Sequence, residues 1–180
     1  IIVNCKTSGN EAYSENDEPV TNLDWSLVWA EEFDGTSLDQ NKWNILQWRP
    51  GWVNNELQAY TNRDTNLYFD GGNLVVRGLV EPGYFDIDYQ GNEYNSDYTS
   101  GRINTAGKYS TAYGRFDIRA KLPKGRGSWP AIWMLGENIS SVGWPKCGEI
   151  DIMEHVGYDD AGIHGSIHTE TFNHTMNTQK

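Results

Sequence analysis

From Trp25 to the end of the chain, short runs of β-branched and aromatic residues alternate with Gly, Pro, Asn and Asp. The first group of residues favours strands and the second favours turns, so the pattern is typical of many short strands. The predicted strands lie in the runs WSLVWAEEF, NLVVRGLV, TSGRINT, GRFDIRAKL, PAIWML, GEIDIMEHV and IHGSIHTETF. Only the run SLDQNKW indicates a short helical turn. The sequence therefore predicts an all-β fold.

Alternation within one run indicates how these strands pack. In GRFDIRAKL, apolar Phe116 and Ile118 alternate with charged Arg115 and Asp117. This period of two is typical of a strand that buries one face and leaves the other accessible. Strands at this spacing, without intervening helices, favour a β-sandwich. We therefore expect a jelly roll of two curved antiparallel sheets.

The length of the chain, 180 residues, is that of one domain. Residues 1–22 are polar and show no periodicity, which predicts a leader or linker, and residues 23–180 form the predicted domain. The chain stops at NHTMNTQK, directly after a predicted strand. Because a sandwich needs both of its sheets closed, we expect residues 23–180 to be the N-terminal and central part of a jelly roll that is incomplete at its C-terminus.

The charge of the chain limits its partners. A formal net charge of −11 repels phosphate backbones and anionic lipids, which disfavours nucleic acid and membrane surfaces and favours a neutral ligand. No apolar run is long enough to span a membrane, and the first residues lack the regions of a signal peptide, as expected of a mature secreted protein. The two cysteines, Cys5 and Cys147, fit neither a zinc site nor a thiol nucleophile, and their pairing with each other is left open.

Three carboxylates lie within six residues of one predicted strand: Glu149, Asp151 and Glu154. On a regular strand Glu149 and Asp151 share a face, while Glu154 faces away. One extra residue at Ile152–Met153 would form a bulge and bring Glu154 back to the face of the other two. We expect this bulge, with Ile150 and Ile152 pointing into the core.

Three acids on one face repel one another unless a ligand, a metal or a shared proton compensates. A solvated polar face explains poorly why the acids alternate with Ile, and three acids on a single strand make a poor metal cage. Two carboxyls about 5–5.5 Å apart are the arrangement of a retaining glycosidase. Trp129, Trp133 and Trp144 lie just upstream, and indole rings stack on the apolar faces of sugars, although core packing is the alternative for each. The pattern thus favours a polysaccharide substrate.

The segment GEIDIMEHVG resembles the signature of glycoside hydrolase family 16, and its Glu-x-Asp-x-x-Glu spacing is similar to that of the bulged branch, which holds laminarinases, agarases and carrageenases. The segments LVWAEEFDG, NNELQAYT, YGRFDIRAKLPKGRGSWPAIWML and HGSIHTETFNHTMNTQ are also similar to bacterial laminarinase segments, in the expected order. Members of the family are longer at the C-terminus, where further strands complete the jelly roll. The resemblance implies an endo-acting retaining glycoside hydrolase.

The resemblance implies a role for each acid. Glu149 matches the nucleophile of the family and Glu154 its general acid/base. Asp151, between them, would orient Glu149 or share a proton within the trio, which would help to keep Glu154 protonated. No cofactor is needed for this catalysis.

The resemblance also implies binding residues. Asn54 and Arg102 match positions that hold sugar hydroxyls, although a surface ion pair is the alternative for Arg102. His168 matches a position in the cleft, against the alternative of a structural histidine. Glu32, in AEEFDG, matches part of a structural calcium site on the convex side.

The predicted function is cleavage of β-1,3-glucan (laminarin) or mixed β-1,3/1,4-glucan by a secreted, monomeric enzyme. Two alternatives are left open. One is an agarase-like hydrolase of the same branch, and the other is a lectin-like jelly roll that binds glucan without cutting it. A pure binder has no need of the three clustered acids, which favours the enzyme.

Overall fold

The structure is a computed structural model of the whole chain. It describes residues 25–159 and 161–178, together with the backbone of residues 2–5. The chain divides into two compact units, Ile1–Arg119 and Ala120–Lys180. In the described part of the chain no helix has the length and apolar character needed to cross a membrane.

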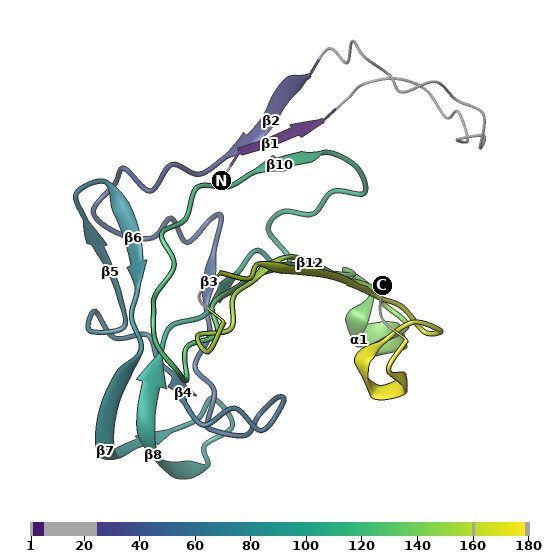
Figure 1. Cartoon of the computed structure of the whole chain (residues 1–180). Coiled ribbons are helices and arrows are strands. Elements are labelled where there is room, and N and C mark those ends of the chain that lie inside the picture. Colours follow the sequence, from purple (N-terminus) through teal and green to yellow (C-terminus); the bar gives the residue numbers. More distant parts are fainter. Residues whose placement is uncertain (1, 6–24, 160, 179–180) are drawn as a thin grey trace. The chain divides into compact units, whose positions relative to one another are not determined.

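The described residues of the first unit form strands and their connections. They are β1 (Ile2–Cys5), β2 (Ser26–Ala30), β3 (Asn44–Ile45), β4 (Ala59–Tyr60), β5 (Leu67–Asp70), β6 (Asn73–Val76), β7 (Leu79–Ile87), β8 (Glu93–Ser100), β9 (Ile103–Asn104) and β10 (Arg115–Asp117). Their pairings follow the orders β10-β1-β2, β3-β9, β4-β8-β7 and β5-β6. The long β7–β8 hairpin and the shorter β5–β6 hairpin are both visible in Figure 1.

The second unit is a three-stranded antiparallel sheet with two single helical turns. Its elements are β11 (Ala131–Leu135), α1 (Ile139–Val142), β12 (Glu149–Glu154), β13 (His164–His168) and the 3₁₀ turn η1 (His174–Met176). The central strand is β12, paired with β11 on one side and β13 on the other. The strand that carries the acids is therefore held along both of its edges.

The predicted β class is confirmed, because each predicted run contains or overlaps a strand. The run SLDQNKW forms the expected single turn, with the Trp43 amide donating to the Asp39 carbonyl at 2.9 Å, the i to i−4 bond of a helix. The prediction missed α1 and η1. The expectation of antiparallel pairing throughout is wrong for one pair, since β4 and β8 run parallel.

Four residues of the stretch predicted to be a leader form a strand. The backbone of β1 pairs antiparallel with β2 and with β10, and lies between them (Figure 1). Residues 6–24 of this stretch are outside the described residues, so the boundary at residue 23 stays a prediction.

A buried polar network fixes the first unit around Asn66. The Asn66 side chain is fully buried, its amide nitrogen donates to the Arg77 carbonyl and to Thr99 Oγ1 at 3.0 Å each, and its Oδ1 accepts from Thr61 Oγ1 at 2.5 Å. Arg63 also donates to Asn66 Oδ1, at 3.0 Å, and forms an ion pair with Glu81. Because a buried amide is costly unless it is satisfied, this network favours one register for the segments that it joins.

Candidate active site

The register of β12 confirms the predicted bulge. Between Asp151 and Glu154 the strand β12 advances by three residues, while its partners on β13 advance by only two, from Ser166 to His164. On β11, Trp133 pairs with Asp151 and the register shifts next to it. A bulge of this kind re-aims the side chains that follow it.

The bulge places all three acids on one face of the sheet. Glu149, Asp151 and Glu154 lie opposite Leu135, Trp133 and Ala131 of β11, in that order. These β11 residues are two positions apart, so they share a face, and directly opposed residues lie on the same face of a sheet. The negative charge of Glu154 raises the pKa of Glu149 and of Asp151, which agrees with this arrangement.

Of the two isoleucines expected to point into the core, Ile152 is half-buried, whereas the expectation is wrong for Ile150 in the described structure. Ile150 is 44% exposed, and its partner on β13, Ile167, is 49% exposed. Asp151 is only 7% exposed. Large rings crowd the face that carries the acids, whereas the aliphatic face of β12 and β13 is open, so the acids occupy the more enclosed side.

His168 lies against two of the acids. Its Nε2 is 3.1 Å from Asp151 Oδ2 and 3.8 Å from Glu149 Oε1, and the residue is 5% exposed. This position makes His168 a neighbour of the acids, and its predicted contact with sugar stays a prediction. Glu149, Asp151 and His168 each offer one ligand atom within 4.8 Å of the others, so this buried group has the donor types that bind divalent transition metals.

Burial is the main cause of the raised pKa of Glu149, followed by the charge of Asp151. His168 and a hydrogen bond from Trp144 act in the opposite direction, because they stabilise the carboxylate. The pKa of Asp151 is also raised, by burial first and by the charge of Glu154 second, against the opposing effect of His168. Carboxyls with raised pKa values, close together, are suited to holding a proton among them.

The raised pKa of Asp151 predicts a pH-dependent cost to stability. A carboxyl that binds its proton more tightly when folded destabilises the fold as pH rises from its ordinary pKa, here 3.8, through the raised value. Asp151→Asn is therefore expected to raise the midpoint of thermal unfolding at pH 7, and the gain is expected to shrink as pH falls toward about 4. Thermal unfolding followed across this range measures the effect.

The matched control for this experiment is Asp64→Asn, which removes an exposed carboxyl of the first unit. We expect it to leave the unfolding midpoint close to that of the unsubstituted protein. A midpoint for Asp151→Asn that is equal to or below the unsubstituted one at pH 7 contradicts the prediction.

Two tryptophans hold the two glutamates. Trp129 is 64% exposed, and its Nε1 donates to Glu154 Oε1 at 3.0 Å. Trp144 is half-buried, and its indole N–H lowers the pKa of Glu149. Trp133, 38% exposed, lies opposite Asp151 and so shares the face of the acids, which settles the orientation that the sequence left open. Each predicted tryptophan thus lies beside one of the acids.

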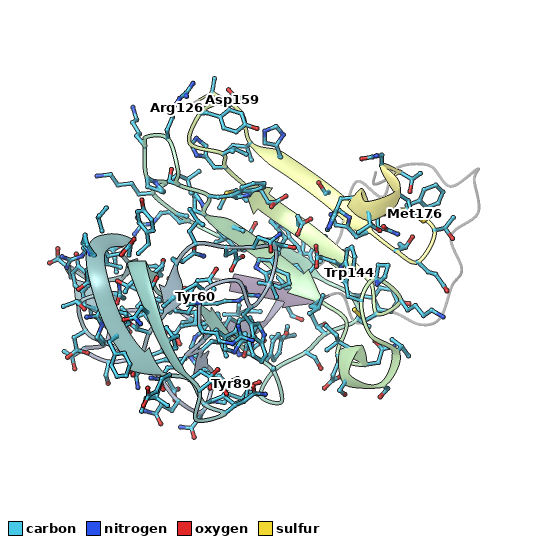
Figure 2. The ribbon with its side chains drawn as sticks, turned by 90° about the horizontal axis from the view of Figure 1, so that it is seen from below. Tyr60, Tyr89, Arg126, Trp144, Asp159 and Met176 are labelled. Carbon is cyan, nitrogen blue, oxygen red and sulfur yellow. The ribbon has the colours of Figure 1, made fainter. Side chains whose placement is uncertain are left out.

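His174 is a residue of this site that the sequence did not indicate. Its ring stacks on Trp144 with centroids 4.8 Å apart and meets the ring of His168 edge-on at 5.3 Å. Figure 2 labels Trp144 beside the segment that carries η1. His174 also lowers the pKa of Asp151. It lies in a 3₁₀ turn outside the strands, where no strand periodicity points to it.

Asn54 and Arg102 lie in the first unit, apart in the chain from the acids. Asn54 is exposed in a loop and has a left-handed φ of 49°, which Asn tolerates better than most residues. The Arg102 guanidinium lies over the ring of Trp48 at 4.6 Å and over that of Tyr60 at 5.4 Å. Their predicted roles as sugar contacts stay predictions.

Glu32 is exposed. It does not belong to the one cluster of possible metal ligands found among the described residues, which consists of Glu149, Asp151 and His168. A cavity of about 310 Å³ lies close to it in the chain, lined by Asp34, Gly35, Thr36, Phe69, Asp70, Gly71 and Gly72. The calcium site stays a prediction.

Cys147 is half-buried with no disulfide partner among the described side chains, and the side chain of Cys5 lies outside them.

Comparison with known proteins gives consistent matches. Residues 74–180 match the family model described as "XgeA-like, catalytic GH16 domain". A β-glucanase of Rhodothermus marinus is 48% identical over 160 residues, which are 87% of this chain and 52% of that protein. The chain thus spans about half the length of this curated relative.

Two solved structures are also similar. The laminarinase of Rhodothermus marinus has a TM-score of 0.76 and 46% identity, covering 87% of this chain and 60% of its own. The laminarinase catalytic domain of Thermotoga maritima has a TM-score of 0.75 and 43% identity, covering 87% and 61%.

Proposed function

The chain belongs to glycoside hydrolase family 16, and on this premise we propose that its protein is an endo-acting, retaining hydrolase of β-1,3-glucan or mixed β-1,3/1,4-glucan. The observation that carries the proposal is the bulge in β12, which brings Glu154 onto the face of Glu149 and Asp151. Two cooperating carboxyls are what hydrolysis with retention requires. The similarity to laminarinases supports β-glucan as the substrate.

In the first step the Glu149 carboxylate attacks the anomeric carbon as the glycosidic C–O bond breaks. Glu154 gives its proton to the leaving oxygen. In the second step the Glu154 carboxylate takes a proton from water, whose oxygen attacks the same carbon and breaks the bond to Glu149. Two inversions at the anomeric carbon retain its configuration.

The neighbours of the two glutamates support this division of roles. Trp144 and His168 stabilise the negative form of Glu149, which is the form that attacks. Trp129 donates to Glu154 Oε1, which fixes the rotamer of that carboxyl and leaves its second oxygen for the proton. Asp151 touches no leaving group in this scheme and acts by orienting Glu149 through the shared His168.

Several further features complete the proposal. Residues 23–180 would form the N-terminal and central part of one jelly-roll catalytic domain, which the TM-scores to solved laminarinases support. The protein would be secreted, since a polymeric glucan does not enter cells. It would act as a monomer. A calcium ion near Glu32 would serve structure and take no part in the chemistry.

The test measures the release of reducing sugar from laminarin, lichenan and agarose by the protein that carries this chain. We expect release from laminarin, and proton NMR of the first product is expected to show the β-anomer, as retention requires. Release from agarose alone would mean that the substrate is agarose, as for an agarase, and that the proposed mechanism still applies. If the protein binds laminarin but releases no reducing sugar from any polysaccharide, the proposed enzymatic function is wrong and the protein is a lectin-like binder.

A further inference from the structure

We propose that a row of aromatic rings in the first unit, formed by Trp48, Trp52 and Tyr89, is a glucan-binding track that extends substrate binding beyond Arg102. This inference rests on the proposed function and names residues that neither the family motifs nor the acids point to. The row is called the aromatic track below. It would hold sugar units of a long chain and would take no part in bond cleavage.

Ring contacts make the track continuous. Arg102 lies over Trp48 at 4.6 Å, Trp48 lies 5.7 Å from Trp52, and Trp52 meets Tyr89 edge-on at 5.5 Å. Trp48 and Trp52 are half-buried, whereas Tyr89, at the far end, is 62% exposed. The track therefore runs from a predicted sugar-binding arginine toward solvent.

The two backbone segments of the track are fixed. Trp48 exchanges a pair of backbone hydrogen bonds with Tyr60, of 3.1 and 2.9 Å. The loop that carries Trp52 is closed by a bond of 2.8 Å from the Gly51 amide to the Glu56 carbonyl. Rings whose positions are set before binding lose less entropy when a ligand arrives.

An ion pair between exposed Arg49 and buried Asp88 lies between Trp52 and the tip of the β7–β8 hairpin. The Arg49 guanidinium lies 5.5 Å from the centre of the Trp52 ring, and its Nε is 3.5 Å from Asp88 Oδ2. The Asp88 side chain is fully buried, and its Oδ1 accepts from the amides of Gln90 and Asn92 at 2.9 Å each. The same carboxylate thus shapes the hairpin tip that presents Tyr89 and positions the arginine beside Trp52.

The chemistry of the track fits a neutral sugar chain. Flat rings contact the C–H faces of pyranose units, and the adjacent Asn54 and Arg102 offer hydrogen-bond groups for hydroxyls. Asn54 lies two residues after Trp52 in the same loop and is exposed. The net charge of −11 disfavours a polyanionic chain, and rings flanked by the guanidinium groups of Arg102 and Arg49 suit hydroxyl-rich ligands better than a dry protein interface.

The track is tested by binding, measured apart from catalysis. In a Glu149→Gln background, calorimetry compares laminarihexaose with laminaritriose for Tyr89→Ala and for Tyr89→Phe. We expect Tyr89→Ala to weaken hexaose binding about 3- to 10-fold, the scale of one aromatic contact, and to leave triose binding unchanged. Tyr89→Phe keeps the ring and is expected to bind hexaose as the unsubstituted residue does.

Trp52→Ala is expected to weaken hexaose binding by more than Tyr89→Ala, because it also removes the ring that Tyr89 contacts. Tyr113→Ala is the matched control, since Tyr113 is an exposed tyrosine of the same unit outside the track. In the otherwise unsubstituted protein, Tyr89→Ala is expected to raise KM for laminarin and to leave kcat unchanged.

Two outcomes would overturn the track, and they are distinguishable. If laminarin is cleaved but Tyr89→Ala, Trp52→Ala and Tyr113→Ala all bind hexaose alike, the track is wrong and the proposed function stands. If the protein neither binds nor cleaves any β-glucan, the proposed function fails and the track fails with it.

Discussion

Glu149→Gln is expected to lower kcat for laminarin hydrolysis by about 10³- to 10⁵-fold, the scale on which loss of a nucleophile acts. The amide matches the carboxylate in size and keeps an oxygen that accepts hydrogen bonds, but it is a far weaker nucleophile. Because the ring contacts of the site are retained, KM is expected to change little. Reducing-sugar release at saturating laminarin measures kcat.

Stability gives this experiment an independent readout. Burial and the charge of Asp151 raise the pKa of Glu149, so removing its charge is expected to raise the thermal midpoint at pH 7 while activity is lost. The matched control, Glu93→Gln, removes an exposed carboxyl of the first unit and is expected to retain activity. Retention of more than about a tenth of kcat by Glu149→Gln would contradict its role as nucleophile.

Glu154→Ala is expected to slow laminarin cleavage by about 10²- to 10⁴-fold, because the leaving oxygen then departs without a proton. An aryl β-laminaribioside with an acidic phenol should escape much of this loss in its first step, since its leaving group needs no proton. The glycosyl-enzyme then accumulates, because no base remains to activate water. Turnover of the aryl substrate and of laminarin, compared side by side, measures the difference.

Azide separates the roles of the two glutamates. It is a nucleophile that needs no general base, so added to Glu154→Ala it should attack the intermediate on Glu149 and give a β-glycosyl azide, with the configuration retained. In Glu149→Ala, azide should fill the vacated space and attack directly, which gives the inverted α-azide. NMR of the products distinguishes the two anomers, and the opposite pattern would exchange the assigned roles.

Sequence periodicity did not determine which face of β12 is buried, as the exposed Ile150 and Ile167 show. Alternation correctly separated Ile150 from the acids, because neighbouring residues of a strand point to opposite faces. It did not identify which face is enclosed. Burial depends on what packs against each face, and the rings of Trp133, Trp144, His168 and His174 come from four other segments of the second unit.

Local chemistry alone determined the β class, the strand that carries the acids and the bulge that unites Glu149 with Glu154. These features follow from strand periodicity and residue spacing within one segment, which is information that a sequence contains. The tertiary structure alone revealed the stack of His174 on Trp144, the contact of His168 with Asp151, and the line of rings from Arg102 to Tyr89. Each of these joins residues of different segments, and such contacts are set by how the chain folds back on itself, which no local pattern encodes.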